Sequence, residues 1–343
     1  MTPIRPKITD EHRRHLLTTR HLLTPATRAA TPEQAVDAVL ALHATDPASV
    51  HLSLAARLAA PSLAEAERTL YTDRTLVRML CMRRTMFVVP HHLAPVVDAS
   101  TARTVAARER RDLLKVLNAQ LGHDARWLRA AEQAVLAALA ERGEASATQL
   151  ADAVPQLRER TVVAAGKPYE SRPRLTSRVL SVLAAEGRIR RGRPLGTWAS
   201  SQFRWTIAEP HPELPADQAR AELATAYLQA FGPATTEDLK WWTGWPLTDT
   251  RTALAATAAV DVDLTSGPGH ARPAVVYAAI QDQLFRAAPL TSSLHCGLLA
   301  WGTHSSHDRQ APHPSPAGRS HGRAEARTGP GEESRRRRRR ALP

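Results

Sequence analysis

Apolar residues recur at helical spacing along most of the chain, and the pattern changes to strand-like alternation in a few short stretches. The clearest change lies between residues 175 and 206. Apolar positions from 175 to 185 follow a helical repeat that Gly187 ends, and residues 188–191 and 202–206 then alternate as two strands around a Gly/Pro-rich turn. A helix followed by a hairpin is the second half of a winged helix-turn-helix, so this stretch predicts such a unit.

The sequence contains an internal repeat with a constant offset of 89 residues. The matching residues are Gly143, Ala145, Ser146 and Leu150 in the first copy and Gly232, Ala234, Thr235 and Leu239 in the second. In each copy an apolar helix is followed by a glycine, a hydroxyl residue that caps a short helix, a second helix and an extended pair. The copies span about 127–207 and 214–280, and the second is expected to have its third helix at 248–258 and strands at 260–264 and 275–280.

Upstream of the repeat, capping residues and apolar periodicity predict several helices that lead into one strand. We expect Thr31 to cap the second of these helices in a capping box with Gln34, and Pro47 to make that helix end near His43. The expected elements are helices at 9–23, 31–43, 48–58 and 62–71, a short helix that carries Leu76, Val77 and Leu80, and a strand at 85–89. This order indicates a further winged-helix-like unit.

The predicted fold class is mainly α with small β-wings, built from tandem winged helix-turn-helix units. The predicted parts are a first winged-helix-like unit at 1–90, a helical connector at 91–126, a basic second unit at 127–207, a third unit at 214–286 and a disordered basic tail at 287–343. Residues 303–343 contain too few apolar side chains to offset the entropy of ordering them. Two interpretations of the tail stay open: Arg335–Arg340 bind nucleic acid without specificity, or the end of the chain is read out of frame.

Positive charge is concentrated in the hairpin region. Residues 172–204 contain one acid, Glu186, and eight arginines: Arg172, Arg174, Arg178, Arg188, Arg190, Arg191, Arg193 and Arg204. Arginines clustered on a helix and its wing lie where the phosphates of a duplex would be. We therefore expect these eight residues to bind double-stranded DNA.

Other residues that suggest chemistry have simpler structural interpretations. Cys81 and Cys296 form no CxxC pair, which argues against a zinc site or a disulfide and fits a reducing cytoplasm.

The chain has no secretory signal core and no run of 18 apolar residues, so we expect no membrane association. The histidine pairs His91 with His92 and His43 with His51 have no carboxylate or cysteine partner at ligand spacing, so no metal site is expected. Of Trp241, Trp242 and Trp245, we expect one ring at the surface and the others in the core.

Two segments, LALHATDPASVHLSLAARL at 40–58 and LVRMLCMRRTMFVVP at 76–90, resemble the bacterial tandem winged-helix DNA glycosylases of the AlkZ-like family. The resemblance covers roughly residues 5–286. It implies repair of DNA with alkylated or crosslinked bases by base removal, without a metal or redox cofactor. Independently of the resemblance, we expect the protein to be a monomer. Members of this family usually continue into a C-terminal β-domain, for which this sequence has no recognisable counterpart.

In that family, a Gln-hydrophobic-Gln motif is taken to place the attacking water and to contact the sugar. The matching positions here are His43, Ala44 and Thr45, followed by Asp46, so both glutamines are replaced. The resemblance makes His43, Thr45 and Asp46 the candidate catalytic residues, with His43 holding water and Asp46 stabilising a cationic sugar. The alternative is that His43 and Asp46 are helix caps. A non-catalytic DNA-binding protein or transcriptional regulator therefore remains open beside the glycosylase.

Overall fold

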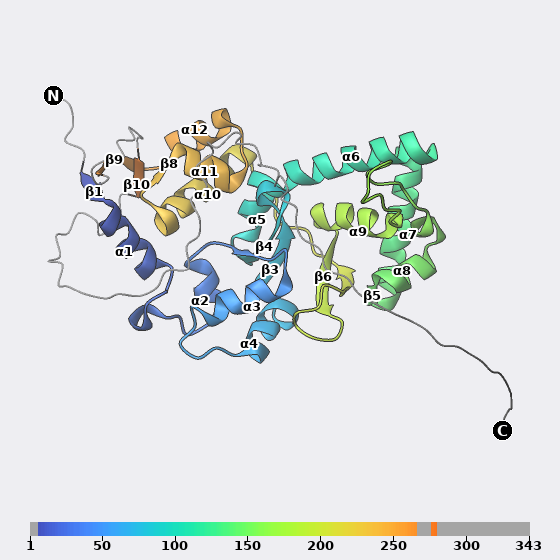
Figure 1. Ribbon diagram of the computed structural model, residues 1–343, viewed down its shortest axis with the longest axis horizontal. Helices are drawn as coiled ribbons and strands as arrows, with labels where there is room; N and C mark the ends of the chain where they lie inside the picture. Colours follow the sequence, from blue (N-terminus) through green and yellow to red (C-terminus); the bar gives the residue numbers. More distant parts are fainter. Residues whose placement is uncertain (1–5, 266–275, 280–343) are drawn as a thin grey trace, which may run out of the picture. The chain divides into compact units, whose positions relative to one another are not determined.

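The computed structural model describes residues 6–265 and 276–279, which belong to a compact unit of residues Met1–Ala287 (Figure 1). The described chain is mostly helical and contains three small sheets. The predicted tail lies outside the described residues, so its disorder stays a prediction. None of the described helices has the length and apolar character needed to cross a membrane.

The same order of elements, a helix, a strand, two helices and two strands, occurs three times along the chain. In the first part these are α2 (Pro32–Asp37), β2 (Leu42–His43), α3 (Pro47–Ala55), α4 (Leu63–Glu67), β3 (Leu76–Leu80) and β4 (Met86–Pro90). In the second they are α7 (Ala125–Arg142), β5 (Glu144–Ser146), α8 (Ala147–Ala153), α9 (Leu175–Ala185), β6 (Ile189–Pro194) and β7 (Phe203–Ile207). In the third they are α10 (Ala216–Phe231), β8 (Ala234–Thr235), α11 (Thr236–Thr243), α12 (Leu247–Ala255), β9 (Ala259–Thr265) and β10 (Val276–Ala279).

Sheet topology repeats together with the element order. The strand orders are β2-β4-β3, β5-β7-β6 and β8-β10-β9, so the third strand of each part lies between the other two. The last of these sheets gains a fourth strand, β1 (Lys7–Thr9), which pairs in parallel with β9. The helix α1 (Asp10–Arg20) follows β1 directly.

Two predictions for the first part are wrong. Residues 76–80 form the strand β3 and not a helix, because they pair antiparallel with β4 in continuous register from Leu76↔Pro90 to Leu80↔Met86. The helix α2 ends at Asp37 and not near His43, because Leu42 and His43 pair with β4 instead. Short apolar runs fit both a helix and a strand, and here pairing within the sheet decides between them.

A long helical connector links the first two parts. It consists of α5 (Ala94–Val97), a π-turn at Asp98–Ala102 and α6 (Arg103–Leu121). Gly122 ends α6 in the left-handed conformation, at φ 69°. Residues 94–121 are therefore helical.

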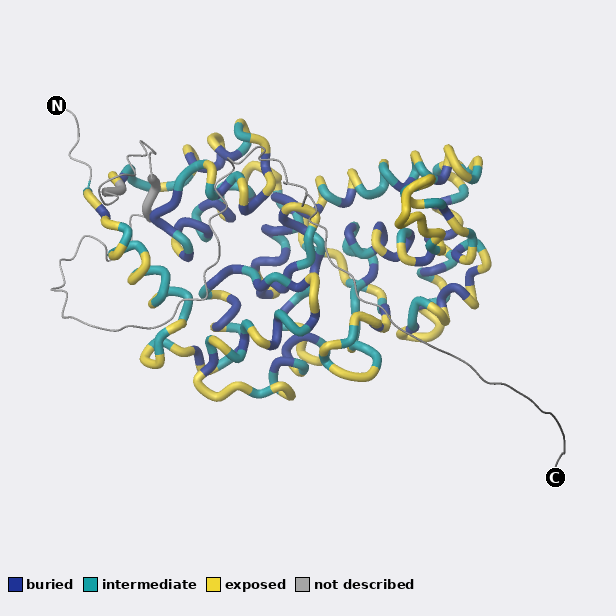
Figure 2. The backbone as a smooth tube through the Cα atoms, in the orientation of Figure 1, coloured by how far each residue is buried: buried dark blue, intermediate teal, exposed yellow. Residues whose placement is uncertain are grey.

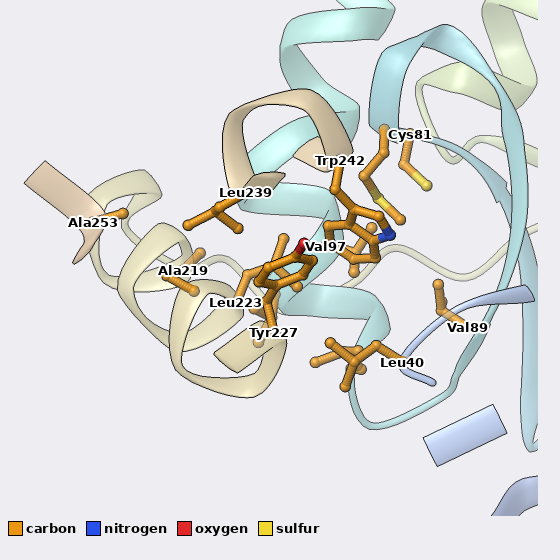
Figure 3. Packing of buried hydrophobic residues seen from close by; sticks show 14 of the residues in the cluster. Leu40, Cys81, Val89, Val97, Ala219, Leu223, Tyr227, Leu239, Trp242 and Ala253 are labelled. Atoms are coloured by element: carbon orange, nitrogen blue, oxygen red, sulfur yellow. The ribbon is translucent and has the colours of Figure 1, made fainter. Parts of the chain in front are cut away.

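In the part of the chain that the structure describes, the buried hydrophobic residues form three clusters. One lies between α6, α7, α8 and α9, and a second lies under α2, α3 and the β2-β4-β3 sheet. The third combines Leu40, Val89 and Val97 from the first 100 residues with Leu223, Tyr227 and other residues of the third part (Figure 3). Along α6 and α7, buried and exposed positions alternate at helical spacing (Figure 2). The first and third parts therefore share one core, although they are far apart in the sequence.

Candidate catalytic segment and nucleic-acid interface

His43 is the last residue of β2 and lies opposite Phe87 of β4. The two rings meet edge to face with centroids 5.5 Å apart. Nε2 of His43 lies 3.3 Å from Oγ1 of Thr45, and the tautomer of the imidazole decides which atom donates the hydrogen bond. Thr45 is exposed, so this polar pair reaches solvent just after the strand. An imidazole and a hydroxyl in this arrangement can orient a water molecule.

Asp46 caps the helix α3. One carboxylate oxygen accepts a hydrogen bond from the backbone N–H of Ala48 at 3.4 Å, and the other accepts from Oγ of Ser49 at 3.1 Å. Pro47 occupies the first helical position, where no amide donor is needed. Asp46 thus takes the capping role that the sequence allowed, whereas His43 lies in a strand and caps no helix.

The loop between β6 and β7 reaches the elements that follow Asp46. The ring of Trp198 in this loop contacts the ring of His51 of α3, with centroids 5.2 Å apart. Nη1 of Arg193 lies 2.8 Å from Oε2 of Glu67, at the end of α4. Side-chain contacts therefore join the basic hairpin to α3 and α4, the two helices that follow the candidate catalytic segment in the sequence.

The eight arginines assigned to DNA differ in their surroundings. Four of them form ion pairs: Arg172 with Glu170, Arg188 with Glu132, Arg193 with Glu67 and Arg204 with Glu144. Arg191 lies over the rings of Phe203 and Trp205, and burial lowers the pKa of its guanidinium to about 10. Arg178 and Arg190 each bury a guanidinium nitrogen. The exposed members of the set are Arg172, Arg174, Arg193 and Arg204.

One of these arginines, Arg188, belongs to a buried network of ion pairs. Glu132 of α7 is 1% exposed and accepts hydrogen bonds from Arg110 of α6 at 2.7 Å and from Arg188 at 3.3 Å. Nη2 of Arg110 also donates to Oε2 of Glu186 at 2.8 Å, and the hydrogen bonds from Arg110 to the two carboxylates raise its pKa. Arg188 and Glu186 thus fasten the end of α9 to α6 and α7.

The tryptophans follow the sequence prediction. Trp242 and Trp245 are buried, whereas Trp241 is 63% exposed. The guanidinium of Arg83, in the turn between β3 and β4, lies 4.0 Å from the centroid of the Trp241 ring. The exposed ring thus has an intramolecular cation–π partner.

The sequence did not single out Arg78, Tyr71 or His51 as functional, yet all three bury polar atoms that have no hydrogen-bond partner among the described residues. Arg78 interrupts the apolar run of β3, and a charged residue at an inward position of a strand is the signal that would have revealed it. That signal depends on identifying the segment as a strand. In the described ranges, no three His, Cys, Asp or Glu side chains gather in a way that would hold a metal ion.

Residues 36–294, well over half of the chain, match the family described as "DNA glycosylase AlkZ-like". The chain belongs to the AlkZ-like DNA glycosylase family. Its fold is also similar to the solved structure of Streptomyces sahachiroi DNA glycosylase AlkZ, with a TM-score of 0.59 and 19% sequence identity over 82% of this chain and 73% of that chain. No curated protein matches the sequence. The candidate pair of His43 and Thr45 lies within the segment that matches the AlkZ-like family.

Proposed function

We propose that this AlkZ-like protein is a DNA-repair glycosylase that binds double-stranded DNA through winged-helix units and hydrolyses the N-glycosidic bond of alkylated or crosslinked bases. Family membership supports the reaction class. The observation that carries the assignment of residues is the exposed polar pair of His43 and Thr45. By the resemblance described above, these two residues correspond to the glutamines of the family motif. The repeated element order and the first-third-second strand order support three winged-helix units.

In the proposed reaction, water attacks C1′ of the sugar as the bond from C1′ to the base nitrogen breaks. The bonding electrons leave with the base, and a purine that carries a positive charge after N7-alkylation departs as a neutral molecule. Because the leaving group already carries the charge, an acid is not required to protonate it. The imidazole of His43 accepts the proton that water loses, and Thr45 holds that water in line.

The sugar passes through an oxocarbenium-like state, which a nearby negative charge stabilises. Asp46 supplies this charge in the proposal, since its carboxylate follows the pair directly in sequence. Its two hydrogen bonds fix its orientation.

The test is release of N7-methylguanine from a methylated duplex, measured by alkaline cleavage at the resulting abasic sites. At equal DNA occupancy, His43→Ala should lose about 100-fold or more of the rate, the scale of a general base. Thr45→Ala should lose less. His15→Ala is the matched control, because His15 is exposed on α1 and outside the segment. Equal rates in wild type and His43→Ala would reject the role of His43.

The second candidate function is a non-catalytic DNA-binding protein. It is favoured by the replacement of both glutamines of the family motif by His43 and Thr45. In that case wild type would bind the methylated duplex and release no base. The same assay therefore separates the two functions.

A further inference from the structure

Arg78 of β3 buries its whole guanidinium. Its Nε, Nη1 and Nη2 atoms are each excluded from solvent, and none has a hydrogen-bond partner in the described part of the chain. The guanidinium carbon lies 5.3 Å from the centroid of the Phe203 ring of β7. This cation–π contact attracts the charge, but it leaves the planar N–H donors unpaired.

Two neighbouring residues also bury polar atoms without a partner among the described residues. These atoms are the hydroxyl of Tyr71 and both ring nitrogens of His51. Burial lowers the pKa of His51, and the positive charge of Arg78 lowers it further. Burial raises the pKa of Tyr71, an effect that the charge of Arg78 opposes. His51 belongs to α3 and Tyr71 to the turn after α4, and both lie within electrostatic reach of Arg78.

A second guanidinium completes the cluster. Arg191 of β6 lies 4.9 Å from the centroid of the same Phe203 ring that Arg78 contacts. Burial lowers the pKa of Arg191 to about 10, and repulsion from Arg78 adds to this effect. Two positive charges thus share one aromatic ring and destabilise each other.

The nearby carboxylates are engaged elsewhere. Glu67 pairs with Arg193, and the oxygens of Asp46 accept the capping hydrogen bonds of α3. In the described ranges, neither Arg78 nor Arg191 forms an ion pair with an acid. A buried cation without a counter-charge is unfavourable, and such unsatisfied groups are expected where a ligand or a function requires them.

We propose that Arg78, Arg191 and Tyr71 form a receptor for one phosphodiester group of a bound DNA strand. The proposal rests on the DNA binding proposed above, but it does not depend on base removal. A guanidinium fork donates two parallel hydrogen bonds to phosphate oxygens, and the hydroxyl of Tyr71 supplies a third donor. The phosphate also provides the missing negative charge.

Because the guanidinium of Arg78 is excluded from solvent, binding requires a local opening, which the proposal places at the contact between the rings of Trp198 and His51. The loop of Trp198 belongs to the basic hairpin, so contact of the hairpin with DNA and opening of the receptor are linked. The helix α3 carries His51 and is capped by Asp46 at its start. Arg78 pairs with Val88 and His43 pairs with Phe87, so the receptor and the imidazole lie on opposite faces of the β2-β4-β3 sheet.

The test compares Arg78→Met with wild type, using an undamaged duplex. Methionine resembles the apolar stem of the arginine side chain and lacks its charged guanidinium. Duplex affinity should fall about tenfold, and the slope of log affinity against log salt should become shallower by about one, the effect of one lost phosphate contact. The melting temperature of the free protein should rise by about 2 °C or more, because an unpaired buried charge is gone.

The controls separate this receptor from a structural role and from the proposed catalysis. Arg129→Met removes an exposed arginine of α7 and should leave the melting temperature unchanged. Arg78→Lys keeps the charge without the fork and should have intermediate affinity. The duplex is undamaged, so the binding test does not depend on base removal.

A lower melting temperature together with unchanged duplex affinity in Arg78→Met would overturn the proposal, since it would make Arg78 a structural residue. Inorganic phosphate distinguishes the source of the anion. Thermal protection of wild type but not of Arg78→Met by phosphate, together with weaker duplex binding by the variant, would support the receptor. The same protection with unchanged duplex binding would assign the site to free phosphate and reject DNA as its ligand.

Discussion

At the scale of single residues, the carboxylate of Asp46 combines a structural task with a proposed chemical one. It caps α3 through Ala48 and Ser49, and it carries the negative charge next to the pair of His43 and Thr45. Two substitutions separate these tasks, because serine caps a helix nearly as well as aspartate but is neutral.

Asp46→Ala should lower the free energy of unfolding by about 1 kcal/mol, whereas Asp46→Ser should change it by less. If the charge stabilises the sugar cation, both variants should lose base-release activity to a similar extent. Urea unfolding and the methylated-duplex assay measure the two effects. Full activity in Asp46→Ser would restrict Asp46 to its capping role.

A pH effect on stability is expected at His21. Burial lowers the pKa of His21 to about 4, although its Nε2 lies 3.1 Å from the carbonyl oxygen of Ala230. The unfolded chain, with an imidazole pKa of about 6.5, binds this proton before the folded protein does. The contribution of His21 to the free energy of unfolding is therefore fully present above a pH of about 6.5. It is lost as the pH falls towards 4, a loss on the order of 3 kcal/mol.

His21→Gln should make the stability less dependent on pH over this interval, because glutamine does not titrate. Thermal unfolding at a series of pH values measures the effect. His15→Gln is the control, since His15 is exposed on the same helix. An equal acid-induced decrease in wild type and His21→Gln would assign the loss to other groups, such as His51 and His211, whose pKa values are also lowered by burial.

Residue types alone were sufficient to predict the helix cap in the candidate segment and the burial of two of the tryptophans. Proline after Asp46 made the cap predictable, and apolar neighbours placed two of the three tryptophans in the core. The environment of Arg78 was not predictable, because it depends on Phe203, which is brought near by the fold and not by the sequence. The ion pairs of Arg188 and Arg204 were missed for the same reason.

At the scale of elements, the repeat identified from the sequence corresponds to matching capping boxes. Ser146 and Gln149 exchange hydrogen bonds at the start of α8, and Thr235 and Asp238 do the same at the start of α11. Local chemistry sets these helix starts, so a sequence pattern was sufficient to find them. The strand β3 was missed because its identity depends on pairing with β4.

Ser146→Ala and Thr235→Ala should each lower the free energy of unfolding by about 1 kcal/mol, since each removes a side-chain acceptor from an N-cap. Urea denaturation measures both. Ser146→Thr and Thr235→Ser retain the hydroxyl and serve as controls. A much smaller loss at one site than at the other would mean that the two caps do not contribute equally.

At the scale of the whole molecule, α1 fastens the beginning of the chain to the third part. Nε of Arg13 donates to the carbonyl oxygen of Pro233 at 2.9 Å, and Nη1 of Arg20 donates to that of Gly232 at 2.5 Å. These contacts come in addition to the pairing of β1 with β9. The first twenty residues therefore stabilise a sheet whose other strands lie beyond residue 233.

Deleting residues 1–20 should increase amide hydrogen exchange in β9 and α11 and leave α7, α8 and α9 nearly unchanged, because the latter helices have a separate core. Hydrogen–deuterium exchange read by mass spectrometry measures this difference. A deletion of residues 1–5 provides the control. Increased exchange throughout the protein would show that the described chain unfolds as one cooperative unit.

The pairing of Lys7 in β1 with Asp263 in β9 also determines when β1 can join its sheet during synthesis. Synthesis proceeds from the N-terminus, so β1 leaves the exit tunnel long before its partner strand β9 exists. The second part can bury its own core during translation, whereas β1 must wait until β9 has emerged. Nascent chains stopped before residue 259 should therefore have a protease-sensitive N-terminus.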